Sequence, residues 1–180
     1  MPKYAAFLRG INIGGRRVKN DALRECFEAM GFDDVAIHIA SGNVIFSTGG
    51  RSVAKVTERI EAGLEGSVGF AATTFLRTAD EMRAMAAHEP FPAELVAASD
   101  GKLQVAILLN SPSDDVRAEV LALATDLDRL AFGDRELYWL PSGRMVESAL
   151  NLRTIEKLLS PMTMRTKNTV EQIAKKHFGH

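Results

Sequence analysis

The sequence predicts an α+β protein with two similarly built halves and a C-terminal helix. Two observations lead to this prediction. Apolar residues change between a spacing of two, which is typical of strands, and a spacing of three to four, which is typical of helices. The resulting order in residues 1–92 is strand, helix, strand, strand, helix, strand, and residues 102–180 begin with the same order. This is the split βαβ order of the ferredoxin-like fold, so we expect two antiparallel sheets, with residues 93–101 as the linker.

In the first half, residues 4–9 form the expected first strand and residues 20–30 the first helix. Asn20 is a preferred N-cap residue, and Gly31 supplies the usual stop. The helix has one apolar face, so the cysteine on that face is expected to be buried and unreactive. The face consists of Leu23, Cys26, Phe27 and Met30.

A β-hairpin is expected over residues 34–48, because apolar residues alternate there on both sides of the turn residues Ser41-Gly42-Asn43. A helix follows over residues 53–66 and a strand over 71–77. The remaining expected elements are a short helix opened by a Thr78–Glu81 capping box, a strand at 102–109, a helix capped by Ser113, strands at 127–132 and 136–140, a helix at 152–159 and a last helix capped by Asn168 with Glu171.

Composition predicts a soluble cytoplasmic protein with no membrane segment. The chain has one cysteine, no apolar run near the ~18 residues of a membrane span, and no long apolar stretch after its first residues. Its formal net charge is −1, which gives no overall attraction to nucleic acid. The charge is unevenly distributed, with +5 in residues 1–24, +4 in residues 151–180 and −10 between them. The basic ends either meet in one positive patch or are ordinary solvated cations. The oligomeric state is left open.

Residues 9–19 are the first candidate binding site. They connect an apolar strand to a helix and contain glycines and cations, a combination suited to holding an anion. The spacing of Gly10, Gly14 and Gly15 fits neither a dinucleotide-binding fingerprint nor a P-loop. The candidate ligand-binding residues are Arg9, Asn12, Gly14, Gly15 and Lys19. The alternative is that the glycines only allow a tight turn.

Two separated motifs also carry a resemblance. Phe7-x-Arg9-Gly10-Ile11-Asn12-x-Gly14-Gly15 and Ser41-Gly42-Asn43-Val44-x-Phe46 resemble the bacterial family called domain of unknown function 1697, and the resemblance runs from Tyr4 to about Phe178. It implies a ferredoxin-like half followed by a related α+β half, and no established activity. The family usually has Arg-Asn-Trp-Asn-Thr-Val at the position of residues 165–170. This chain has Thr166 in place of the asparagine and Lys167 in place of the tryptophan. The family also has a lysine where Ala149 stands.

Further candidate ligand-binding residues are Ser41 and Asn43 in the hairpin turn, and Arg165 and Asn168 before the last helix. For Ser41 and Asn43 the sequence favours a purely structural role in the turn. We expect the first and third strands to run parallel, which would place Arg9 and Asn43 at opposite ends of the sheet. One site using both would then need the second half or another subunit.

Catalysis has little support in the sequence. His38 alternates away from the apolar side of its strand, and His177 and His180 lie near the chain end. We expect no catalytic group, no metal and no cofactor. The best interpretation is a protein that binds a phosphorylated or other anionic small molecule through residues 9–19. The alternatives are a nucleic-acid-binding protein and a structural or interaction module.

Overall fold

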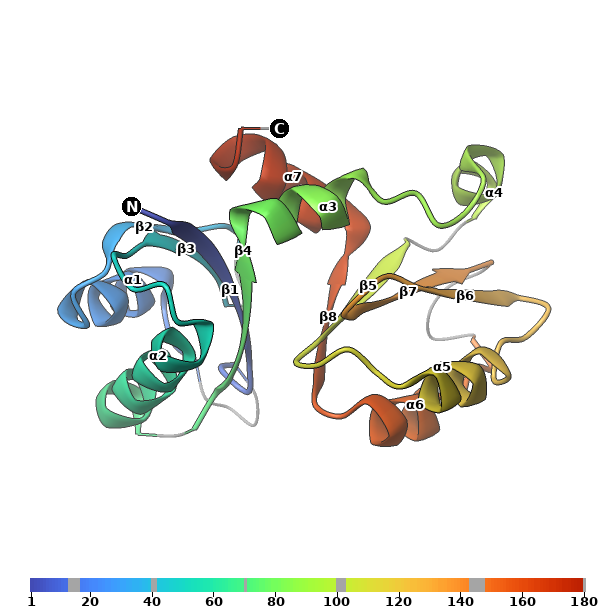
Figure 1. The fold of residues 1–180 in the computed structure, drawn as a ribbon, viewed down its shortest axis with the longest axis horizontal. Helices are drawn as coiled ribbons and strands as arrows, with labels where there is room; N and C mark the ends of the chain where they lie inside the picture. The colour runs from blue at the N-terminus through green and yellow to red at the C-terminus, as the bar shows by residue number, and fades with distance from the viewer. Residues whose placement is uncertain (13–16, 40–41, 70, 100–102, 143–147, 180) are drawn as a thin grey trace. The chain divides into compact units, whose positions relative to one another are not determined.

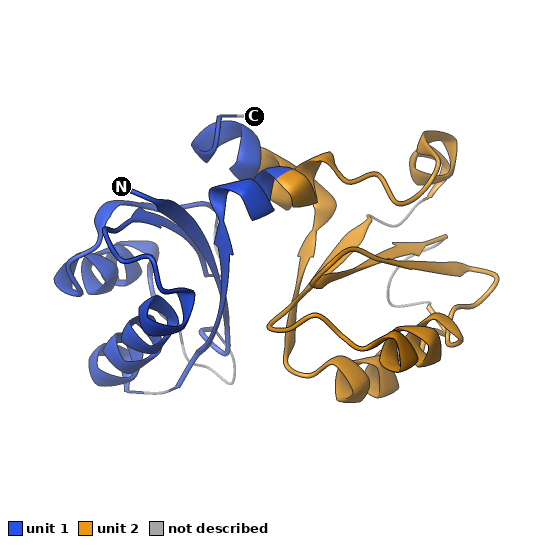
Figure 2. Cartoon of the chain, in the orientation of Figure 1, with its two compact units in different colours: residues 1–83, 173–180 blue, residues 84–172 orange. Residues whose placement is uncertain are grey.

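The computed structural model describes residues 1–12, 17–39, 42–69, 71–99, 103–142 and 148–179 (Figure 1). The chain forms two compact units (Figure 2). The first consists of Met1–Arg83 with Ile173–His180, and the second consists of Ala84–Gln172. Each contains a four-stranded antiparallel sheet, which confirms the predicted fold class. The expected domain boundaries stay a prediction, and within the expected linker Ala93–Ala98 form helix α4.

In the first unit, the sheet order is β2-β3-β1-β4, and both helices lie on one face of the sheet (Figure 1). This is the order of a split βαβ unit, with β1 and β3 as the two central strands. The elements are β1 (Lys3–Arg9), α1 (Asn20–Ala29), β2 (Asp33–Ile37), β3 (Asn43–Ser47), α2 (Val53–Val68) and β4 (Thr73–Thr78).

The core of the first unit lies between this sheet and its two helices. The predicted face of α1 packs there through Leu23, Cys26 and Phe27, with Met30 at the margin. The rings of Phe32 and Phe46 are 4.5 Å apart between centroids. Gly31, at a φ of +85°, follows α1 as expected. The regular apolar spacing was therefore a reliable guide to this core.

The expected parallel direction of the first and third strands is wrong. Strand β1 pairs with β3 antiparallel, with Lys3 opposite Ser47 and Phe7 opposite Asn43. The physical reason is the connection: α1 returns the chain so that β2 runs parallel to β1, and the β2–β3 hairpin then reverses it. The C-terminal end of β1 therefore lies beside the N-terminal end of β3.

Asn20 is not the N-cap of α1. The helix begins one residue earlier, with Lys19 as the N-cap in extended conformation. The side-chain amide of Asn20 instead donates a hydrogen bond of 3.4 Å to the carbonyl oxygen of Ile39, in the β2–β3 connection. A tertiary contact has therefore replaced the local cap that the residue type favours.

Helix α3 (Ala79–Ala87) begins with the predicted capping box. The backbone N–H of Thr78 donates to the Glu81 carboxylate at 2.8 Å, and the N–H of Glu81 donates to the Thr78 hydroxyl at 3.2 Å. Met82 and Met85 are buried, as their spacing predicted. Reciprocal capping makes this helix start locally determined.

In the second unit, the sheet order is β6-β7-β5-β8, the same topology as in the first. None of the helices in the described part of the chain has the length and apolar character needed to cross a membrane. The elements are β5 (Gln104–Leu108), α5 (Asp114–Leu121), β6 (Asp128–Phe132), β7 (Glu136–Pro141), α6 (Leu152–Leu159), β8 (Met162–Thr166) and α7 (Lys167–His177), which ends in the first unit.

Strand β8 was missed, because residues 163–168 were interpreted as a loop before the last helix. They pair antiparallel with β5, with Thr163 opposite Ile107 and Arg165 opposite Val105. The last helix starts at Lys167, and the hydroxyl of Thr166 accepts from the N–H of Thr169 at 3.1 Å. Thr166, not Asn168, is therefore the capping residue.

Asp128 is the polar centre of the second core. Its carboxylate accepts from Trp139 Nε1 at 2.9 Å, from the Ser148 hydroxyl at 2.7 Å and from the Thr125 hydroxyl at 2.8 Å. Burial alone would raise the pKa of Asp128, but the hydrogen bonds from Ser148, Trp139 and Thr125 outweigh it and lower the pKa. The arrangement satisfies the buried indole N–H and joins β6 to β7.

The end of α7 closes the first unit. The ammonium group of Lys3 donates to the carbonyl of His177 at 3.2 Å, and the guanidinium of Arg83 donates to the carbonyl of Phe178 at 3.0 Å. Phe178 is buried. Residues 177 and 178 are thus fixed by two charged donors and one buried ring.

Cys26 is 6% exposed, with its sulfur 3.8 Å from the carbonyl oxygen of Gly63. We expect a thiol reagent such as dithionitrobenzoate to modify the native protein at least roughly a hundredfold more slowly than the urea-unfolded protein, because reaction requires opening of α1. Labelling rates measured by absorbance check this. Equal rates in the two states would contradict the burial.

Candidate functional site

The antiparallel pairing brings the two sequence motifs of the first unit together. Arg9 is the last residue of β1, and Asn43 is the first residue of β3. The backbone N–H of Leu8 donates to the carbonyl of Gly42 at 2.9 Å. The strand-to-helix connection and the hairpin turn therefore lie at one end of the sheet, and the expectation of opposite ends is wrong.

The close approach of the hairpin turn to the end of β1 requires a glycine at position 42. Its φ is +78°, a conformation that favours glycine. A Cβ added there would lie 3.0 Å from Cβ of Leu8 and 3.3 Å from Cγ2 of Ile11. The absence of a side chain lets the hairpin turn rest directly on the end of β1.

Asn12 and Asn43 shape this end of the sheet. The side-chain oxygen of Asn12 accepts from the N–H of Val18 at 2.9 Å, which closes the connection from within. The amide of Asn43, which is 3% exposed, donates to the carbonyl of His38 at 3.1 Å. Asn43 is therefore too buried to meet a ligand directly, and its side chain closes the hairpin.

Exposed cationic side chains on residues 9–19 lie at this end, next to the exposed carboxylate of Asp21 in the first turn of α1, which pairs with Arg24. Arg9, Arg17 and Lys19 are exposed. The side chain of Lys19 makes no hydrogen bond to the first turn of α1 that the structure describes. The positive end of the helix dipole lies there as well. The predicted residues Gly14, Gly15 and Ser41 lie outside the described residues.

Arg165 and Asn168 belong to the second unit and differ from each other. The guanidinium of Arg165 donates to the Thr163 hydroxyl at 2.7 Å and to its neighbour's carbonyl, that of Met164, at 2.9 Å. Burial lowers the pKa of Arg165 to about 10. Asn168 is exposed in the first turn of α7. Whether either joins Arg9 in one site stays a prediction, because Arg9 belongs to the other unit.

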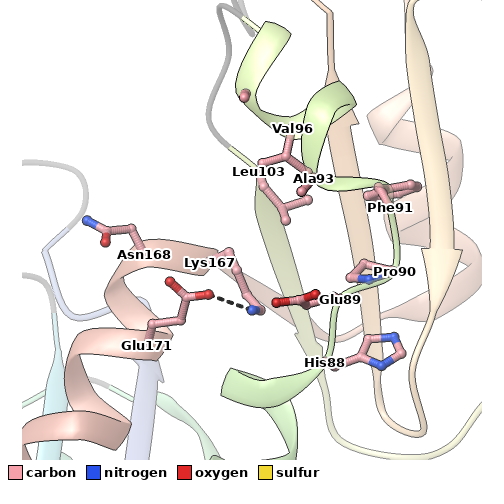
Figure 3. Close-up of a pocket in the computed structure, with 11 residues that line it drawn as sticks. His88, Glu89, Pro90, Phe91, Ala93, Val96, Leu103, Lys167, Asn168 and Glu171 are labelled. Carbon is pink, nitrogen blue, oxygen red and sulfur yellow. Dashed lines mark hydrogen bonds and ion pairs between the residues drawn. The ribbon is translucent and has the colours of Figure 1, made fainter.

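Sequence reasoning missed a pocket in the second unit. Its cavity measures about 420 Å³, and mostly apolar residues line it. The segment after α3, the residue before β5 and the first turn of α7 form its wall (Figure 3). No local pattern could have found it, because the start of α7 is distant in the sequence from the other two segments. The sequence features that could have pointed to the pocket are the run Glu89-Pro90-Phe91-Pro92 and the cation Lys167.

Two histidines of the first unit were also missed. The rings of His38 and His177 are 5.6 Å apart between centroids and nearly perpendicular. His38 is 9% exposed, and neither Nε2 atom has a hydrogen-bond partner among the described residues. In the same part of the chain, no cluster of three or more His, Cys, Asp and Glu side chains is placed to hold a metal ion. The two rings form an edge-to-face contact.

We expect replacement of Gly42 by alanine to destabilise the protein by about 1–3 kcal/mol, because the backbone is left-handed and the added methyl meets Leu8 and Ile11. Urea unfolding measures the difference. Gly49→Ala is the matched control, since a Cβ there has no atom within 4 Å, and it should stay within about 0.5 kcal/mol of the parent. Equal effects of the two changes would contradict the close approach.

Lowering the pH should destabilise the first unit. Burial, and then the charges of His38, Lys176 and Lys3, lower the pKa of His177 from its ordinary value of 6.5. Below that value the unfolded chain binds the proton more strongly than the folded one, so stability falls as the pH decreases. Urea unfolding at about pH 7.5 and about pH 5.5 should show a loss that His177→Gln reduces. An unchanged loss in the variant would refute this origin.

A solved structure with a similar fold is that of the conserved bacterial protein SP0830 from Streptococcus pneumoniae. The two are 23% identical, the comparison covers 97% of each chain, and the TM-score is 0.72. This likeness shows the fold. Comparison with curated proteins finds no match. The family model described as "Protein of unknown function (DUF1697)" matches residues 1–138, which include both first-unit motifs. The chain therefore belongs to the DUF1697 family.

Proposed function

We propose that the protein binds an anionic small molecule, such as a phosphorylated metabolite, where residues 9–19 connect β1 to α1. The observation that carries the proposal is the antiparallel pairing of β1 with β3. It places the hairpin turn beside the exposed cations and the start of α1, so two motifs contribute to one end of the sheet. Arg9 and Lys19 would supply charge, and Asn12 would fix the backbone around the ligand.

The start of α2 offers an internal comparison. Arg51 and Lys55 give it cations as well, but the hydroxyl of Ser52 accepts from the N–H of Lys55 at 3.4 Å. At α1, the N-cap is Lys19, which makes no such hydrogen bond in the part that the structure describes. Free N–H groups at a helix start favour an external anion, and this difference supports α1 as the binding end.

The nucleic-acid alternative has less support. Base-stacking sheets expose aromatic rings on their central strands. Phe7, Phe46 and Phe75 of the first sheet are all 0% exposed. The net charge of −1 also provides little attraction to phosphate backbones. The structural-module alternative rests on the hydrogen bonds of Asn12 and Asn43 and predicts that no anion stabilises the protein.

We expect inorganic phosphate or a sugar phosphate from a metabolite set to raise the melting temperature. A ligand at about 100 times its Kd stabilises the native state by about 2.7 kcal/mol, roughly 5–10 °C for a chain of this size. The double variant Arg17→Ala with Lys19→Ala should lose this increase, because it removes two exposed cations of the site. Differential scanning fluorimetry at low salt measures both.

The matched control is Arg51→Ala with Lys55→Ala, which removes the same charge beside the capped start of α2. It should retain the ligand-induced increase. If no anion stabilises the parent, the proposal fails in favour of a structural module. If both double variants lose the increase equally, binding follows net charge and not this site. Retention on heparin with steep salt dependence would favour nucleic-acid binding.

A further inference from the structure

The pocket of the second unit is a second candidate binding site, and it differs chemically from the cationic end of the first sheet. Its volume of about 420 Å³ lies in the range of small-molecule sites. One side is apolar, with Phe91 beside Pro90 and with Val96 and Leu103 opposite them (Figure 3). A flat hydrocarbon or heteroaromatic body would lose water on both faces in this space.

The polar end of the pocket is centred on Lys167. This residue is 5% exposed, and its ammonium group donates to the carbonyl of Ala86 at 2.9 Å and to the carboxylate of Glu171 at 2.8 Å. The backbone N–H of Lys167 donates to the carbonyl of Leu103 at 2.8 Å. These contacts hold the side chain in place and, among the described residues, leave one of its three N–H donors available.

Glu89 supplies the complementary acceptor. It lines the pocket, and its side chain lies on the same side of the pocket as Lys167 in Figure 3. Within the described residues, Glu89 makes no hydrogen bond or ion pair. An available N–H of Lys167 and the carboxylate of Glu89 therefore face the cavity from different elements, α7 and the segment after α3.

The polar side chains of the pocket select against simple ions. Lys167 contributes one positive charge, and Glu89 and Glu171 contribute two negative charges. A carboxylate or phosphate would meet this net negative charge in a half-enclosed space. A protonated amine would be attracted to Glu89 but would leave the N–H of Lys167 without an acceptor. A neutral group with one donor and one acceptor satisfies both Glu89 and Lys167 without adding charge.

We propose that this pocket binds a neutral small molecule with a flat apolar body and a head group that donates and accepts hydrogen bonds. A primary carboxamide or the corresponding edge of a nitrogen heterocycle has this chemistry. The N–H of the head group donates to Glu89, its oxygen or ring nitrogen accepts from Lys167, and the ring lies against Phe91 and Leu103. This site is independent of the proposed anion site, which lies in the other unit.

Three probes with one ring and different charges test the proposal: benzamide, benzoate and benzylamine. We expect benzamide to shift the methyl NMR signals of Val96 and Leu103, with a Kd on the order of 1–10 mM for a fragment of this size. Benzoate and benzylamine should bind at least about tenfold more weakly, because benzoate adds a charge that the pocket opposes and protonated benzylamine offers no acceptor to Lys167. No shift with benzamide, or equal affinities for the three probes, would overturn the proposal.

Two pairs of variants test whether benzamide binds in this pocket. Ala97→Phe fills the cavity and should abolish the benzamide shifts, whereas Ala98→Phe, on an exposed neighbour in α4 outside the lining, should preserve them. Glu89→Gln should reduce the preference for benzamide over benzoate several-fold, and Glu94→Gln should leave it unchanged. If Ala97→Phe binds benzamide as the parent does, or if both glutamate variants behave alike, the ligand does not occupy this pocket in the proposed way.

Discussion

The position of β1 between two antiparallel neighbours is the constraint on which the first unit depends. Ala5, Ala6 and Phe7 are at most 1% exposed, so this strand is covered on both faces. Its pairing with β3 fixes Phe7 opposite Asn43, and its pairing with β4 fixes Arg9 opposite Thr73. A shift of one residue would turn each apolar side chain to the other face. The junction of the two motifs at one end of the sheet is therefore a consequence of register, maintained by the whole core.

What the sequence predicted well was local. The face of α1 around Cys26 and the Thr78–Glu81 capping box follow from spacing within one turn or two of a helix, and the structure contains both. The direction of β3 relative to β1 follows from the predicted order of strand, helix and hairpin, so the expectation of parallel strands misread the connection and not the residues. Strand β8 has threonines and an arginine in place of an apolar run, and its conformation is set by pairing with β5. The pocket requires α7 to lie beside segments that are distant from it in the sequence, so its polar end at Lys167 could not be inferred either.

Several of the predicted site residues have a structural role that differs from the ligand-binding role expected of them. Asn12 was selected as part of a loop suited to holding an anion, and Asn43 as part of the hairpin turn, yet their side chains make the hydrogen bonds that hold the two turns. Arg165 is largely removed from water and donates to its own strand. Polar residues in unusual positions thus indicated where the backbone is constrained.

The two proposed ligands differ in charge because the two sites differ in charge. The first site uses exposed cations beside a helix start, and the second uses a lysine already paired with a carboxylate.

The division of α7 between the two units affects the order in which the protein can assemble during synthesis. The first unit ends at Arg83 and resumes at Ile173, so its sheet is complete long before the segment that closes it exists. At ~5–20 residues per second, the intervening stretch takes roughly 5–20 seconds to make. During that interval the partners of Lys3 and Arg83 in the last turn of the chain are missing. Part of the surface of the nascent first unit therefore stays uncovered until residues 173–180 have been synthesised.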